Sequence, residues 1–350
     1  MTKLYTLQMV GIFESEEPII HTEETIGNVA KIKRMKVFDG GKSVSVPALS
    51  GNSFRGQLRD LMADEFIQIV RGQTGPVKMS KDNYGVIFSG GILGENSDMN
   101  TKLNRFIDNI PLIRVMGSAF GNVMLPSKLS VSHLIPLTRE TRQSLRDRLS
   151  IIEATPEGGK VFELQTYLNK TLSNLPEAED ISFEEGPLTR KDDTKNPHLI
   201  QNVEINATQE QSPQMIYHVE CIASGILLLQ RIASKFPLDE HELGCFFSAM
   251  AQFAQHPMVG GRGAAGYGRV NFLYKIIITP IRAQQESAQQ ESAQQESSEG
   301  TVTLWLDTKC LANYAGKLQF EDGDKIGNFI KIYHSHVRQH TDDIKVLLAK

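Results

Sequence analysis

The stretch GGRGAAGYGRVNFLYKIII, residues 260–278, joins a glycine-rich loop to a strongly alternating apolar segment. From Val270 to Ile278 apolar side chains recur at every second position, which predicts a half-buried strand. A helix is predicted before the loop, because apolar residues at helical spacing follow the capping residue Asp239 and the segment ends at Pro257. A dinucleotide-binding loop needs a strand first and a helix after it, so the GxGxxG match at residues 261–266 does not indicate a nucleotide cofactor.

The first half of the chain carries a similar order of elements. Residues 4–11 alternate as a strand does, and residues 54–70 place apolar side chains at helical spacing behind Ser53, which we expect to cap the helix. Residues 217–223 and 226–229 are predicted as strands. The order strand, helix, strands and then strand, helix, strand is typical of an α+β fold with a ferredoxin-like (RRM-like) sheet.

Three segments fall outside this pattern. Residues 71–215 are too long to be connections, so we expect them to hold helical or irregular insertions. Residues 283–300 repeat AQQES three times and are predicted to be a low-complexity linker or loop that divides a main body, residues 1–282, from the rest. Residues 301–350 begin like a strand and end in a predicted helix.

The composition is that of a globular chain with reduced thiols. The 350 residues are 40% hydrophobic and include 28 glycines, enough for a sizeable core. No apolar run reaches the roughly 18 residues of a membrane helix, and residues 1–13 lack the pattern of a signal peptide. The 3 cysteines are far apart and have no CxxC spacing, which favours a cytoplasmic protein over a disulfide framework or a zinc ribbon.

Charge is segregated along the chain, although the net charge is only -4. Residues 31–59 hold seven Lys or Arg against one acid, and residues 262–282 hold four bases and no acid. A phosphate-binding groove needs only a local basic stripe, because the affinity depends on how many phosphates are neutralised. The two basic segments therefore indicate a polyanion partner.

The glycine-rich loop is the first candidate binding site. Glycines let backbone amides approach a ligand closely, and the arginines and the tyrosine of the loop bring two charges and a stacking ring, which suits a phosphate backbone and its bases. The alternative interpretation is a tight structural turn. The candidate residues are Gly260, Gly261, Arg262, Gly263, Tyr267 and Arg269.

The second candidate is PALSGNSFRGQLR, residues 47–59, where a small polar turn leads into a helix. Free amides and the positive end of the helix dipole favour an anion there. Arg55 and Arg59 lie one turn apart, opposite the apolar stripe, a spacing that suits successive phosphates. The alternative is a capped helix with solvated arginines. The candidate residues are Ser50, Gly51, Asn52, Ser53, Arg55 and Arg59.

Together the two motifs resemble the CRISPR-associated RAMP superfamily, in particular the backbone subunit (the seventh Cas family) that coats guide RNA in effector complexes. PALSGNSFRG looks like the start of the family's first helix, and GGRGAAGYGRV looks like its glycine-rich loop. MGSAFGN, residues 116–122, resembles a third family segment and adds Ser118 and Phe120 to the candidates. The resemblance covers residues 1–280 and is greatest to the type IV version.

The resemblance implies a ferredoxin-like palm, a helical insertion and a β-hairpin thumb, which we place near residues 196–215. Lys33 and Arg34 in the basic stretch would face the RNA, with a solvated basic strand as the alternative. The implied function is a non-catalytic subunit that binds guide RNA (crRNA), oligomerises along it beside other Cas subunits and leaves the bases free to pair with target nucleic acid.

Two other functions are considered. A related type III-like subunit would cleave target RNA with an aspartate after the first strand, but this region offers only Glu23, Glu24 and the turn residue Asp39. A scaffold without nucleic acid would leave the basic segments as solvated faces. His336 and His340 have zinc-compatible spacing without the glutamate of HExxH, so with His334 they are predicted to be polar helix residues, and neither a metal nor a cofactor is expected.

Overall fold

The computed structural model describes residues 3–72, 75–92, 97–153, 172–189, 216–281, 300–317, 319–321 and 323–349. These residues form a mixed α+β fold with large antiparallel sheets and helices. The predicted thumb strands at 196–215 and the AQQES repeats lie outside the described residues.

The main sheet has the strand order β10-β14-β1-β16-β17, and every neighbouring pair along it is antiparallel. The alternating segments predicted at residues 4–11 and 270–278 form the adjacent strands β1 and β16 of this sheet. Short strands β11 and β15 extend the pairing of β14 and β1. The strands are β1 (Leu4–Ser15), β10 (Leu129–Val131), β11 (Ile135–Pro136), β14 (Leu227–Ser234), β15 (Leu238–Asp239), β16 (Val270–Ile281) and β17 (Val302–Asp307).

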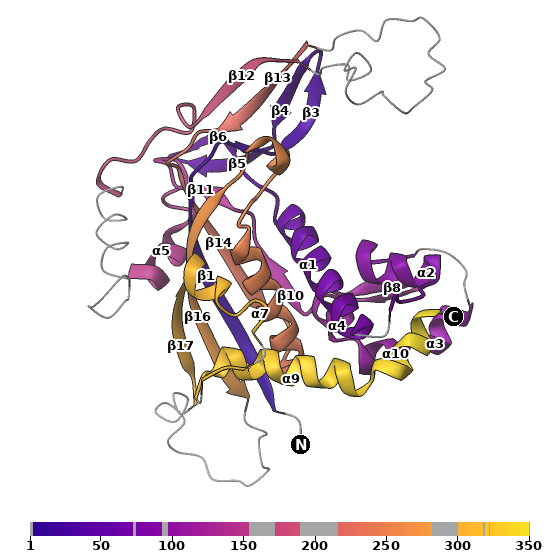
Figure 1. The fold of residues 1–350 in the computed structure, drawn as a ribbon. Helices are drawn as coiled ribbons and strands as arrows, with labels where there is room; N and C mark the ends of the chain where they lie inside the picture. Colours follow the sequence, from indigo (N-terminus) through magenta and orange to yellow (C-terminus); the bar gives the residue numbers. More distant parts are fainter. Residues whose placement is uncertain are drawn as a thin grey trace, which may run out of the picture.

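A second sheet, with strand order β12-β13-β4-β3, lies beyond one end of the main sheet (Figure 1). The predicted strand at 217–223 belongs to this sheet and not to the main one. A turn in which Gly225 has a φ of 80° carries the chain from β13 into β14. Its strands are β2 (Ile19–Ile20), β3 (Thr22–Ile26), β4 (Val29–Ile32), β12 (Ser182–Thr189) and β13 (Ile216–Ile222).

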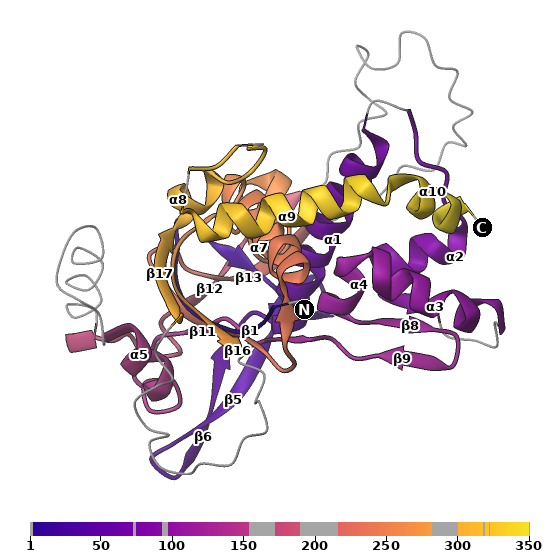
Figure 2. The same ribbon diagram turned by 90° about the horizontal axis from the view of Figure 1, so that it is seen from below.

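The remaining described strands form two smaller sheets. β5 (Arg34–Asp39) and β6 (Lys42–Pro47) form a hairpin that projects from the body (Figure 2). β7, β8 and β9 form a three-stranded sheet beside the helical insertion. Their bounds are β7 (Gly91–Ile92), β8 (Ser118–Phe120) and β9 (Val123–Leu125).

The helices gather mainly on one face of the main sheet. The two helices predicted from apolar spacing, α1 and α7, form this layer together with α4 and α9. The helices are α1 (Gly51–Arg71), α2 (Lys81–Tyr84), the π-helix η1 (Gly85–Ser89), α3 (Ser97–Asn109), α4 (Pro111–Met116), α5 (Arg146–Glu153), α7 (Glu240–Gln255), the 3-10 turn η3 (Gly263–Ala265), α8 (Thr308–Ala312), α9 (Lys325–Gln339) and α10 (Thr341–Ala349).

The helix caps follow local chemistry. Asp239 caps α7 as predicted, in a reciprocal capping box with Glu242. The prediction that Ser53 caps α1 is wrong, because the helix begins at Gly51 and Ser50 is its N-cap. Gly51 must stay small, since a Cβ there would lie 2.3 Å from the Val131 carbonyl oxygen.

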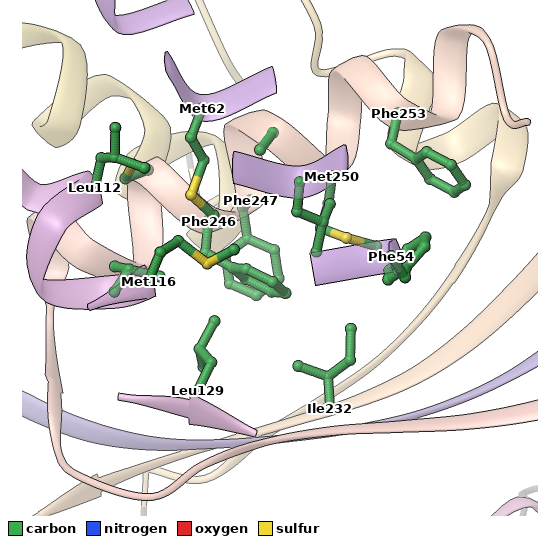
Figure 3. Close-up of a cluster of buried hydrophobic side chains, with 14 of the residues drawn as sticks. Phe54, Met62, Leu112, Met116, Leu129, Ile232, Phe246, Phe247, Met250 and Phe253 are labelled. Atoms are coloured by element: carbon green, nitrogen blue, oxygen red, sulfur yellow. The ribbon is translucent and has the colours of Figure 1, made fainter. Parts of the chain in front are cut away.

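The main core lies between this sheet and its helices. Figure 3 shows side chains of α1, α4 and α7 facing two sheet residues, Leu129 of β10 and Ile232 of β14. Phe54 and Phe253 pack edge to face with ring centroids 5.1 Å apart. The apolar periodicity of α1 and α7 thus corresponds to the faces that the helices bury.

The C-terminal segment joins the main body. β17 pairs with β16, and α9 packs along α7 (Figures 1 and 2). His334 of α9 lies 2.8 Å from a carboxylate oxygen of Glu65 on α1. Beyond α9, the buried side-chain amide of Asn83 donates to the Leu347 and Leu348 carbonyls of α10 at 3.0 and 2.8 Å. The 301–350 segment therefore ties several helices together.

A histidine cluster at the end of α9 predicts sensitivity to acid. The ring of His336 lies 4.4 Å from that of His241 and 4.6 Å from that of His340. Burial and then these two neighbours lower the pKa of His336 from 6.5 to about 4, against the opposing effect of Asp239. As the pH falls, His336 is protonated in the unfolded chain before it is protonated in the folded one. The free energy of unfolding therefore has its full value above pH 6.5 and decreases as the pH drops toward 4.

The full change in pKa would correspond to about 3 kcal/mol. Because His336 is only half-buried and solvent screens its charge, we expect a loss of about 2 kcal/mol, which urea unfolding between pH 7 and 4 would measure. His336→Met should make the free energy of unfolding less dependent on pH. The matched control His256→Met, at an exposed histidine, should leave the pH dependence unchanged. An unchanged pH profile in His336→Met would contradict this assignment.

Candidate nucleic-acid interface

The amides at the start of α1 already have protein acceptors. The Ser50 amide donates to His21 Nε2 at 3.1 Å, and the Gly51 amide donates to His133 Nδ1 at 2.8 Å. The Asn52 amide donates to the Ser50 hydroxyl at 3.2 Å. The prediction that these groups are open to an anion is therefore wrong for the structure as described.

His21 is suited to this acceptor role. Burial, followed by the nearby Lys33 ammonium, lowers the pKa of His21 below its usual value, so the neutral ring is favoured. A neutral imidazole can accept a hydrogen bond, whereas a protonated one cannot. The two histidines thus complete the helix cap in place of an anion.

The two arginines of α1 lie on one side of the helix but differ in exposure. Arg59 is buried, and its guanidinium donates to the Met116 and Gly117 carbonyls at 3.0 and 2.6 Å and to the Ile87 carbonyl at 3.4 Å. Burial, followed by Arg55, lowers the pKa of Arg59 to about 10. The prediction that Arg59 lies on an open face is wrong. Arg55 is half-buried and also donates to the Met116 carbonyl.

The MGSAFGN segment lies mainly in the core. Phe120 is fully buried and packs edge to face against Phe106 at 5.5 Å, so it offers no ring to an RNA base. The Ser118 hydroxyl is buried and donates to the Val86 carbonyl at 3.1 Å. The segment positions the wall of a cavity of about 650 Å³ beside α1, into which Arg55 and Asn52 also face.

The glycine-rich loop is closed by backbone hydrogen bonds. The amides of Gly261 and Gly268 donate to the Ile20 and Pro18 carbonyls at 2.7 and 2.8 Å. A Cβ at Gly260 would lie 2.2 Å from the Ile20 carbonyl oxygen, and one at Gly268 would lie 2.1 Å from that of Val259. These contacts support the structural-turn interpretation for those glycines. Gly263 begins η3, where a Cβ would meet the Met258 side chain at 3.4 Å.

Arg262 is an exposed residue of this loop. Its backbone is left-handed, with a φ of 60°, and its guanidinium lies over the Tyr217 ring at 4.5 Å from the ring centroid. Left-handed backbone is unusual for a residue with a side chain and is found often at ligand sites. Arg262 and Tyr217 line a second cavity of about 650 Å³ with His218 and the β3–β4 turn.

The other basic candidates are paired with acids. Lys33 lies 2.6 Å from Glu23, Arg34 pairs with Glu220, and Arg269 lies 2.8 Å from Glu16. The basic stretch is therefore locally neutralised, because the fold places strands rich in glutamate beside it. The Tyr267 hydroxyl donates to Glu185 at 2.8 Å, and burial, followed by this carboxylate, raises the pKa of Tyr267 to about 12.

The glycine loop and α1 are next to each other. The Gln57 side-chain amide on α1 donates to the Met258 carbonyl at 2.6 Å, just before the loop. Ile20, which pairs with Gly261, directly precedes His21 at the helix cap. Both motifs thus contribute to one region, in which α1 lines one of the 650 Å³ cavities and Arg262 of the loop lines the other.

Nothing in the described part of the chain forms a group of three or more His, Cys, Asp or Glu side chains able to hold a metal ion. Glu23 is paired with Lys33, and Glu24 lies on the exposed strand β3. No helix within the described ranges is long and apolar enough to cross a membrane.

Comparisons with known proteins give structural matches alone. No family model and no curated protein matches the chain. A chain of a type IV-B CRISPR complex matches with a TM-score of 0.44 and 17% identity over 83% of this chain and 97% of that one. The crystal structure of Thermofilum pendens Csc2 matches with a TM-score of 0.40 and 13% identity over 98% of this chain and 88% of that one.

Several residues of this region were missed at the sequence level. Tyr217 was assigned only to an alternating strand, and it is 45 positions from Arg262. His21 and His133, which accept from the amides at the start of α1, carry no local motif. Only the fold brings these side chains to the two motifs, so a single sequence offers no signal for them.

Proposed function

We propose that the chain binds single-stranded guide RNA as a non-catalytic backbone subunit of a cytoplasmic CRISPR ribonucleoprotein. The observation that carries this proposal is the Arg262–Tyr217 stack, an exposed cation fixed on an aromatic face by a strained backbone beside a cavity. Aromatic and arginine planes bind bases of any sequence by stacking, while the guanidinium edge binds phosphate.

The topology supports a ferredoxin-like palm in this proposal. The order β10-β14-β1-β16 is antiparallel throughout, with α1 after β1 and α7 before β16. That is the arrangement of two split β-α-β halves. In the proposed role, several copies of the chain lie along one guide and contact other Cas subunits. The bases of the guide stay free to pair with target nucleic acid.

The proposal is tested with the purified full chain. We expect copurifying RNA of discrete length and tight binding of a guide-length single-stranded RNA, measured by fluorescence anisotropy at several salt concentrations. Affinity should fall steeply as salt rises, because phosphate contacts dominate. An RNA-free monomer that ignores added RNA would overturn the proposal.

Arg262→Ala should weaken RNA binding about tenfold or more for all sequences alike, since stacking on an aromatic platform contributes roughly 1–3 kcal/mol per base. The matched control is Arg139→Ala, which removes the same charge from an exposed pair with Glu177. Equal losses in both variants would indicate net charge rather than the stack. Loss confined to some sequences would indicate base readout instead.

A further inference from the structure

The cavity beside α1 has walls that the proposed phosphate contacts do not explain. Its volume of about 650 Å³ lies within the range of small-ligand pockets, roughly 300–1,000 Å³. α1 forms one wall, and η1, β8–β9 and β10 supply the others. The side chains that line it include an aromatic ring and an exposed methionine from parts of the insertion that are distant in sequence, Phe88 and Met124.

The apolar wall is unusually exposed. Met124, in the middle of β9, is 74% exposed. Phe88 is half-buried, and its ring stacks on that of Tyr84 with ring centroids 4.6 Å apart and an angle of 20° between the planes. A flat ring and a polarisable thioether are surfaces on which another flat group can pack.

The cavity is also rigidly built. The buried Arg59 guanidinium joins the Ile87 carbonyl of η1 to the end of α4, and Gly90 packs against that guanidinium, where a Cβ would lie 3.5 Å away. Gly91, with a φ of 117°, lets β7 approach so closely that a Cβ would meet the Ala119 backbone at 2.2 Å. η1 itself is a π-helix, an element that is frequent at functional sites.

The charges favour an anionic ligand. Arg55, the buried Arg59 and Lys235 line the cavity, and Asp60 is the acid among the lining residues. Three cations against one acid suit a nucleotide, whose base packs on the apolar wall while its phosphates meet the cations. A peptide side chain would use the apolar wall but not this excess of positive charge.

We propose that this cavity binds one unstacked nucleobase of the RNA strand, between the Phe88 and Met124 side of the wall and the cations of α1. This proposal rests on the RNA-binding function proposed above. It adds one position at which a base of the bound RNA leaves the stack of its neighbouring bases. The neighbouring phosphates then lie near Arg55 and Lys235, on the side of α1 that faces the cavity.

The test is photocrosslinking of the full chain to oligouridylate that contains 4-thiouridine, with the crosslinked peptides identified by mass spectrometry. We expect crosslinks on peptides that contain Phe88 or Met124. Met124→Ser should lower RNA affinity about fivefold or more, the lower end of the loss for one stacked base. Because Met124 is exposed, this change should leave the fold intact. The matched control is Val346→Ser, at a 48% exposed residue of α10 outside the cavity.

The outcomes separate this proposal from the one above. If RNA binds and Arg262→Ala weakens it, but crosslinks avoid the cavity and Met124→Ser binds like the wild type, the nucleobase site is wrong and the RNA surface stands. If Met124→Ser abolishes self-association at unchanged RNA affinity, a second protein chain occupies the cavity and the site is wrong. If the wild type binds no RNA, both proposals fail.

Discussion

Gly244→Ala is expected to destabilise the protein by about 2 kcal/mol, the usual cost of inserting a methyl group into a well-packed core. A Cβ at Gly244 of α7 would lie 2.0 Å from the Phe329 carbonyl oxygen and 2.7 Å from Tyr333 Cβ, both in α9. Neither obstacle is the flexible end of a side chain, so one helix must move away from the other. Thermal or urea unfolding would measure the loss.

The matched control is the same substitution in another helix. Gly56 lies inside α1, and a Cβ there meets nothing within 4 Å. Gly56→Ala should therefore stabilise the protein by about 0.5–1 kcal/mol, because alanine favours the helix and restricts the unfolded chain. If both substitutions stabilise the protein to the same extent, the close contact between α7 and α9 does not exist as described.

Gly244 also illustrates what the sequence could and could not predict of the fold. Periodicity predicts β1, α1, α7 and β16, because each buries one face and the burial dictates the spacing of its apolar residues. Contact between two helices that are distant in sequence, such as α7 and α9, leaves no such periodic pattern. A glycine within α7 is only a weak propensity signal unless the partner helix is known, so the attachment of residues 301–350 to the body could not be predicted.

The candidate site, like the fold, could be predicted from the sequence only in part. Glycine content and helix-start chemistry correctly drew attention to the loop at 260–268 and to residues 47–59, which lie together in the fold. The basic stretch at 31–36 was interpreted as free charge, but Glu23 and Glu220 pair with its side chains. Glu220 is nearly 190 positions from its partner Arg34, and charge counted along the chain does not include partners across a sheet.

Arg59→Met is expected to cost about 3 kcal/mol of stability, because it keeps the apolar stem but removes the guanidinium that donates to the Gly117 and Ile87 carbonyls, while the Met116 carbonyl keeps Arg55 as a donor. The Met116 and Gly117 carbonyls end α4, and the Ile87 carbonyl belongs to η1, so one guanidinium joins three acceptors from two segments. Arg59→Lys should recover only part of the loss, since an ammonium is a compact donor that cannot span the same set. Urea unfolding of the three proteins gives the comparison.

Arg55→Met is the control that separates stability from binding. Arg55 is half-buried and its only described acceptor is the Met116 carbonyl, so we expect a loss of stability below about 1 kcal/mol, typical of one hydrogen bond. Its guanidinium lines the cavity, so RNA affinity should fall in this variant while the fold is retained. Arg59→Met should lose both, because the cavity wall depends on the carbonyls that Arg59 holds. If Arg59→Met kept full stability and lost only RNA affinity, Arg59 would contact phosphate directly, and its buried position would be wrong.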